Sequence, residues 1–145
     1  MNKYLKLKRE QEKRVNEFPM MFAFSRSQFE EGMKKLGLEP GDTDKIISIG
    51  AGGFIRKSDN EAFDSLFDNL DKEIEEAIAK DETGEGFIYD MFYYELGNHE
   101  YCITGSVTDT LDSLGMTIDK VKSDERLKHG LKKAIYDVLK YDEEN

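Results

Sequence analysis

The side chains best suited to chemistry in this chain lie close together between positions 90 and 102. They are Asp90, His99, Glu100 and Cys102. Residues 100–104 read as a short strand, on which side chains three residues apart point to opposite faces, and this argues against a nucleophile–base pair of His99 and Cys102. The other histidine, His129, lies 30 residues away and repeats no ligand spacing, so a zinc site has little support. We therefore expect no catalytic residue, no metal and no cofactor, and a protein that is not an enzyme.

A glycine run at residues 50–53 is a second candidate for chemistry. Backbone N–H groups of glycine-rich turns can approach a phosphate closely. A phosphate-binding loop opens directly into a helix, however, whereas residues 54–57 follow here and read as a strand. We therefore predict a tight hairpin turn. The alternative is an anion site made by Gly52, Gly53, Arg56 and Lys57.

An acidic stripe follows one face of the clearest helix in the sequence, residues 58–80. Apolar residues recur there at steps of three and four from Phe63 to Ile78, which places them on one stripe that we expect to be buried. Like charges at the same spacing destabilise a helix by roughly 0.2–0.5 kcal/mol per pair, and this helix has several such pairs. The acidic residues at these steps are Glu61, Asp64, Asp68, Asp71 and Glu75.

Three interpretations of the acidic stripe remain open. It is a solvated face, or it imitates the charge of a nucleic-acid backbone and occupies a basic groove of another protein, or it pairs with the basic first helix of a second copy in a homodimer. Lys6, Arg9 and Arg14 are the cations of that first helix that would meet it. A surface this acidic should repel nucleic acid and anionic membranes and attract basic protein surfaces.

Aromatic side chains are concentrated between residues 87 and 101. Proteins that stack nucleic-acid bases surround such rings with Lys and Arg, but no basic residue occurs between Lys80 and Lys120. Core packing, with a protein-binding patch as the alternative, is therefore the better interpretation.

Hydrophobic period and capping signals predict an α+β fold, with a small, mostly antiparallel sheet of about four short strands packed with about six helices. Ser27 and Ser58 are each followed three residues later by Glu, as in a capping box. Gly37 and the pair at residues 97–98 are expected to end helices. Helices are expected at residues 3–17, 27–36, 58–80, 87–96, 106–114 and from 123 onward, and strands at 20–25, 46–49, 54–57 and 100–104.

Length and composition predict one folded domain over residues 1–145, with residues 1–18 as a peripheral basic helix and 142–145 as a polar tail. The net charge of −10 is uneven, because residues 58–119 carry 2 basic and 17 acidic residues. There is neither an apolar run of membrane-spanning length nor a signal peptide, so we expect a cytoplasmic protein. The single cysteine, Cys102, excludes an internal disulfide and is expected to be a small buried residue.

Three segments carry a resemblance: residues 22–25 (FAFS), 49–59 (IGAGGFIRKSD) and 101–105 (YCITG). They resemble small uncharacterised proteins carried by phages and mobile elements of gut bacteria. The resemblance implies a setting in which small acidic proteins often inhibit host defence nucleases, as anti-CRISPR proteins do.

We therefore expect a non-enzymatic acidic binding protein that engages a basic surface of a host protein, such as a nucleic-acid-binding surface. It would bind neither nucleic acid directly nor a membrane. The alternatives are a self-associating structural module and a protein that binds a small ligand or anion at the Gly50–Gly53 turn.

Overall fold

A computed structural model describes residues 1–144 of the chain. Within them lie eight α-helices and three β-strands, so the predicted α+β class is confirmed with one strand fewer than expected. The elements are α1 (Lys3–Glu17), β1 (Met21–Phe22), α2 (Arg26–Lys35), β2 (Ile46–Gly50), β3 (Gly53–Arg56), α3 (Asn60–Lys80), α4 (Phe87–Asn98), α5 (Tyr101–Thr104), α6 (Thr108–Ser113), α7 (Ile118–Ser123) and α8 (Glu125–Glu144), with 3₁₀ turns at Thr43–Lys45 and Lys57–Asp59.

The chain forms two compact units. The first, which we call the sheet unit, is Glu12–Asp71. The second, the helical unit, combines Met1–Gln11 with Lys72–Asn145, of which Asn145 lies outside the described residues. The boundaries fall within α1 and α3, so each of these helices contributes to both units. The tail expected at residues 142–145 is helical as far as Glu144, where α8 ends.

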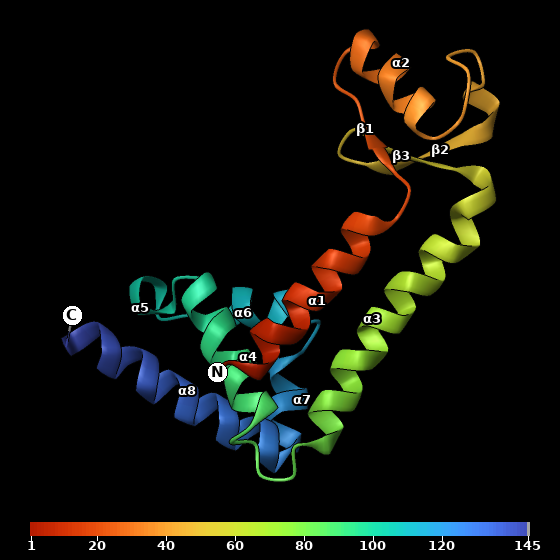
Figure 1. Ribbon diagram of the computed structural model, residues 1–145. Coiled ribbons are helices and arrows are strands. Elements are labelled where there is room, and N and C mark those ends of the chain that lie inside the picture. The colour runs from red at the N-terminus through yellow and green to blue at the C-terminus, as the bar shows by residue number, and fades with distance from the viewer. Residues whose placement is uncertain (145) are drawn as a thin grey trace. The chain divides into compact units, whose positions relative to one another are not determined.

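The sheet unit is built on the hairpin that the glycine run was predicted to close, and that prediction is confirmed. β2 and β3 pair antiparallel, with Ile47 opposite Ile55 and an irregularity between Ser48 and Gly50. β1 pairs antiparallel with the other side of β3, which gives the strand order β1-β3-β2. Figure 1 shows α2 over one face of this sheet. The core between them contains Met21, Met33, Leu36 and Ile46.

α2 is bounded by a serine cap at its start and a glycine after its end. The glycine was predicted correctly, and the cap was predicted two residues too late. Ser25 Oγ accepts a hydrogen bond from the N–H of Gln28 at 3.2 Å, so the cap lies two residues before the predicted Ser27. An N-cap residue has extended backbone, and this residue is Ser25. Ser27 lies within the first turn of the helix, so it cannot be the cap. Gly37, with φ of 74°, follows the helix in the left-handed conformation, as predicted.

α4 is the central helix of the helical unit, and the predicted helix at residues 87–96 is confirmed. It packs along α8 and against α6. Its side chains are buried on several sides, which explains why its sequence fits both a strand and a helix pattern. The buried side chains of α4 are Phe87, Ile88, Met91, Phe92, Glu95 and Leu96.

The predicted strand at residues 100–104 is wrong, because this segment forms the short helix α5. Gly97 lies inside α4, which ends at Asn98, and Glu100 instead takes the left-handed conformation with φ of 55°. Cys102 is exposed on α5, not buried as expected. The helix expected from residue 123 onward is confirmed as α8, which begins at Glu125, and the short helix α7 before it was not predicted.

α3 is the acidic helix. It begins at Asn60, two residues after the predicted cap Ser58, because residues 57–59 form a 3₁₀ turn. Of its apolar stripe only Leu70 is fully buried, and Phe67 is 39% exposed. The described residues include no helix with the length and apolar character that crossing a membrane requires.

Candidate functional site

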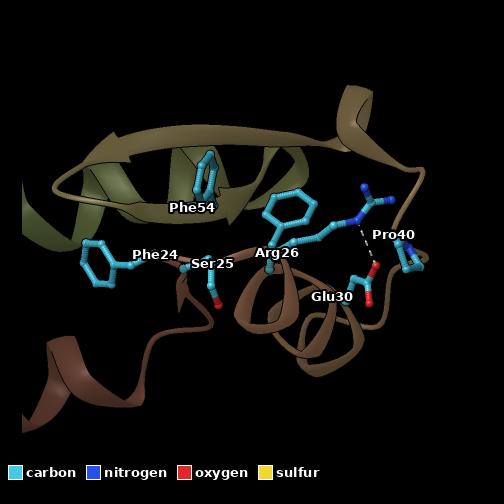
Figure 2. A pocket seen from close by; sticks show the side chains of 8 residues that line it. Phe24, Ser25, Arg26, Glu30, Pro40 and Phe54 are labelled. Atoms are coloured by element: carbon cyan, nitrogen blue, oxygen red, sulfur yellow. Dashed lines mark hydrogen bonds and ion pairs between the residues drawn. The ribbon is translucent and has the colours of Figure 1, made fainter.

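An aromatic hollow of about 580 Å³ opens in the sheet unit between the first turns of α2 and the β2–β3 hairpin (Figure 2). Three of its side chains are phenylalanines, and its charged side chains belong to Arg26 and Glu30. Figure 2 shows Phe24 and Pro40 at opposite ends, with Phe54 above the middle. The residues that line it are Ala23, Phe24, Ser25, Arg26, Phe29, Glu30, Pro40 and Phe54.

Phe24 carries an exposed ring on an ordered backbone. Its residue is 78% exposed. The backbone is held on both sides, because the Ala23 N–H donates to the Gly52 carbonyl at 2.9 Å and the Phe24 N–H donates to Gln28 Oε1 at 2.8 Å. A Cβ atom on Gly52 would lie 2.6 Å from Phe24 Cε1, and Gly52 has φ of +78°. The positive φ therefore favours glycine at this position, and the missing Cβ leaves room for the ring.

Phe29 and Phe54 form the aromatic wall of the hollow. Their ring centroids are 5.9 Å apart and their planes are inclined at 87°. This edge-to-face arrangement is a favoured geometry for aromatic pairs. Both rings are half-buried, so one part of each remains open to the hollow.

Arg26 supplies the positive charge of the hollow. Its side chain is 92% exposed, and its Nε atom lies 3.4 Å from Glu30 Oε1. Ion pairs this exposed contribute about 0–1 kcal/mol, so Glu30 does not hold the guanidinium group tightly. Arg26 is also the first residue of α2, whose N-terminal end adds positive electrostatic potential.

The structure does not bring together the four residues of the predicted anion site. Gly52 and Gly53 lie at the hairpin turn, whereas Arg56 and Lys57 lie at the other end of β3. Arg56 is engaged within the sheet unit, because its Nε donates to Asp59 Oδ2 at 2.8 Å and its Nη1 donates to the Leu36 carbonyl at 3.2 Å. A Cβ on Gly53 would lie 2.8 Å from the side chains of Ile49 and Phe22, so this glycine makes room for side chains. Lys57 is exposed.

Sequence reasoning missed the hollow, although one signal was present. Residues 18–25 and 46–55 contain no charged residue, in a chain of which 36% of residues are charged. These two stretches form β1, β2, most of β3 and the turns beside them. Phe22 and Phe24 within these stretches remain exposed, and contiguous exposed apolar surface can mark a binding site.

The acidic stripe of α3 is exposed along its whole length. We call Glu61, Asp64, Asp68 and Asp71, which belong to the sheet unit, the acidic face. Glu75 continues the stripe into the part of α3 that belongs to the helical unit, and it is also exposed. Among the described residues, none of the five carboxylates forms an ion pair within 4.0 Å. Within residues 1–144 the stripe is therefore exposed and without direct ion-pair partners.

A buried carboxylate in the helical unit is the remaining cluster with chemical potential. Glu95 is 7% exposed, and its Oε2 atom lies 2.9 Å from Ser113 Oγ and 3.4 Å from His99 Nε2. The imidazole is within ion-pair distance but not aligned for a hydrogen bond, so His99 Nε2 has no hydrogen-bond partner among the described residues. The Tyr4 phenol also hydrogen-bonds to Glu95. Because Ser113 Oγ contacts Glu95 directly and His99 Nε2 has no hydrogen-bond partner among the described residues, the cluster does not form a Ser–His relay.

Alkaline pH is expected to weaken this cluster. Burial raises the pKa of Tyr4, and the Glu95 carboxylate raises it further. A folded-state pKa above the unfolded value of about 10 means that the contribution of Tyr4 to stability is present below that pH and is lost as the pH rises beyond it. We expect Tyr4→Phe to lower the free energy of unfolding by about 1–2 kcal/mol at neutral pH and to reduce the loss above pH 10. Urea unfolding across pH measures both effects, and Tyr136→Phe, at an exposed tyrosine, is the control, so equal effects of the two variants would contradict the role of Tyr4.

The other residues first considered for chemistry are placed separately. Asp90 Oδ2 accepts from the Lys3 N–H at 2.8 Å and so caps the start of α1. Glu100 and Cys102 are exposed on the segment that follows α4. Within residues 1–144 no group of three His, Cys, Asp or Glu side chains is arranged to hold a metal ion.

Comparison with known proteins shows the family to which the chain belongs. Residues 3–137 match the model of a family described as a family of unknown function (DUF7659). Because the match covers most of the chain, the protein is a member of this family. Searches of curated proteins and of solved structures found no match.

Proposed function

We propose that the protein is a non-enzymatic binding protein that presents its acidic face to a basic surface of another protein. The observation that carries this proposal is the exposure of Glu61, Asp64, Asp68 and Asp71 on one stripe of α3 without an ion-pair partner among the described residues. Arginine and lysine side chains of a partner would supply the missing countercharge.

The spacing of these carboxylates has an energetic cost that a partner would offset. Three neighbouring pairs, Glu61–Asp64, Asp64–Asp68 and Asp68–Asp71, are separated by three or four residues. Each such pair destabilises a helix by roughly 0.2–0.5 kcal/mol in isolation. A basic surface seated on the acidic face relieves this repulsion, and the field of the face accelerates the encounter at low salt.

Phe67 gives the acidic face an apolar neighbour. It lies three residues after Asp64 and four before Asp71, so it is adjacent to both on the helix surface. Its residue is 39% exposed, and its ring packs edge-to-face on Phe63 with centroids 4.9 Å apart. Protein interfaces commonly combine a buried aromatic anchor with surrounding charges. The face therefore suits a partner that presents cations around an apolar spot.

A nucleic-acid-binding protein is the proposed class of partner. Such proteins carry rows of Lys and Arg side chains that neutralise phosphates spaced along a backbone. The resemblance to small proteins of phages and mobile elements makes a host defence nuclease a candidate within this class. A second copy of this chain is the competing partner, because the exposed side chains of Lys6 and Arg9 on α1 are also basic.

Charge reversal tests the proposal. The variant Asp64→Lys/Asp68→Lys/Asp71→Lys changes exposed positions and is expected to fold, because lysine is a good helix former. We expect it to lose capture of nucleic-acid-binding proteins from a bacterial lysate, with affinity for a captured partner at least roughly 100-fold weaker, because three attractive contacts become repulsive. Quantitative mass spectrometry of the captured proteins is the measurement, and binding should also fall as salt is raised.

The matched control reverses three other exposed carboxylates. Asp142→Lys/Glu143→Lys/Glu144→Lys, near the end of α8, changes the net charge by the same amount away from the acidic face. If this variant retains capture and the α3 variant loses it, the acidic face is supported as the binding surface. Equal capture by both variants would refute the proposal. Light scattering at low salt tests the second copy, since a dimer that dissociates in the α3 variant would identify a homodimer as the partner.

A further inference from the structure

We infer that the aromatic hollow of the sheet unit is a binding site for a small planar ligand that carries an anionic group. The inference does not depend on the proposed function, because the hollow and the acidic face are formed by different residues.

The size and walls of the hollow suit a small ring compound. Ligand sites typically have volumes of roughly 300–1,000 Å³, and this hollow has about 580 Å³. Its apolar walls come from Phe24, Phe29, Phe54 and Pro40. Flat aromatic and proline surfaces favour a flat apolar ligand, because they can stack on its ring without loss of hydrogen bonds.

The exposed ring of Phe24 is prepared for such a contact. Two hydrogen bonds fix the backbone at residues 23 and 24, and the ring lies over Gly52 while Phe24 remains 78% exposed. A backbone that is already ordered loses little conformational freedom when a ligand covers the ring that it carries. Phe22, the other exposed phenylalanine of this region, is 52% exposed and does not line the hollow.

The charge of the hollow determines which end group the ligand carries. Arg26 has a guanidinium group that donates in a planar fork suited to carboxylate, sulfonate or phosphate oxygens. Its present partner, Glu30, is exposed and is held at 3.4 Å, so an anion of the ligand can replace it. The positive N-terminal end of α2 beside Arg26 favours the same charge. A cationic ring compound would have the Glu30 carboxylate as its partner, but the positive N-terminal end of α2 would oppose its charge.

Fluorescence titration with anilinonaphthalene sulfonate tests the inference, since this probe is aromatic and anionic. We expect saturable binding of one probe to the folded protein, with affinity about tenfold weaker in Phe24→Ala and in Arg26→Gln, because each loses one stacking contact or one charge-assisted hydrogen bond. Glu30→Gln releases the guanidinium group and is expected to bind the probe more tightly. A naphthalene ring bearing a trimethylammonium group should compete weakly, and naphthalene sulfonate strongly.

Two matched variants separate the hollow from general surface binding. Phe22→Ala removes an exposed phenylalanine outside the hollow, and Lys34→Gln removes a positive charge at the far end of α2. Both are expected to bind the probe as the unchanged protein does. Absence of saturable binding would overturn the inference, as would losses in these two variants equal to those in Phe24→Ala and Arg26→Gln. Circular dichroism verifies that every variant is folded.

Discussion

Gly130→Ala is expected to destabilise the helical unit by about 3 kcal/mol, since overpacking a well-filled core typically costs 1–3 kcal/mol and more where nothing can move. Gly130 lies within α8 and is buried. A Cβ atom there would lie 2.6 Å from the carbonyl oxygen of Gly84 and 2.7 Å from Ile88 Cγ2. The Gly84 carbonyl cannot rotate away, because Gly84 has φ of +86° and itself lies against the backbone carbonyl of Arg126. The backbone of the loop before α4 and that of α8 therefore approach as closely as two glycines permit.

Gly97→Ala is the matched control, because Gly97 is also a helical glycine but a Cβ there would have no neighbour within 4 Å. Alanine favours a helix over glycine by about 1 kcal/mol, so this variant is expected to be more stable than the unchanged protein. Urea unfolding followed by circular dichroism measures both changes. If Gly130→Ala were as stable as the unchanged protein, the close approach of α8 to the loop would be wrong.

The elements that the sequence predicted well are those whose signals are local and repeated. The hairpin at residues 46–56 has apolar strands on each side of a glycine run, and the structure has the same turn. The end of α2 at Gly37 rests on one residue that readily adopts positive φ. α1 follows the predicted range, because Pro19 disfavours helical geometry at Phe18.

The segment after α4 shows where such signals fail. Residues 101–104 favour a strand by composition, yet they form α5, which packs against α4 and α8. A segment of four residues has too little intrinsic preference to decide its own structure, so tertiary contacts decide it. Gly97 looked like a helix end, but nothing opposes continuation of α4 through Asn98, and Glu100 takes the left-handed position instead.

The two candidate sites also differ in how far the sequence could predict them. The exposure of the acidic stripe follows from the period of one helix, so its residues could be named from the sequence. The aromatic hollow combines side chains from positions 23 to 54, and no local pattern announces such a combination. From the sequence, the glycines at residues 52 and 53 are explained by a turn or by an anion site. The structure adds a third explanation for glycine at these positions, because the rings of Phe24 and Phe22 lie against them.

Asp81→Asn is expected to destabilise the helical unit by about 2 kcal/mol at neutral pH, because it leaves part-buried N–H donors with one acceptor oxygen fewer and removes the charge that strengthens their hydrogen bonds. The Asp81 carboxylate accepts from the backbone N–H groups of Gly84 at 2.9 Å, Ile88 at 3.0 Å, Gly86 at 3.1 Å and Thr83 at 3.2 Å. It thereby closes the loop and satisfies the start of α4. In asparagine an NH₂ group replaces one of the two carboxylate oxygens, so it faces the backbone N–H groups and cannot accept hydrogen bonds from them.

The pH dependence of the stability of Asp81→Asn tests whether the ionised carboxylate is what stabilises the loop. Burial alone would raise the pKa of Asp81, but the four N–H donors outweigh it and lower the pKa. A lowered folded-state pKa means that the stabilising contribution is present above the unfolded value of about 3.9 and is lost as the pH falls through the folded value. The difference in free energy of unfolding between the unchanged protein and Asp81→Asn should therefore be largest near neutral pH and shrink below about pH 4. Glu82→Gln, at the exposed neighbouring position, should show no such difference, and a constant gap for Asp81→Asn across this pH range would mean that the ionised carboxylate does not hold the loop.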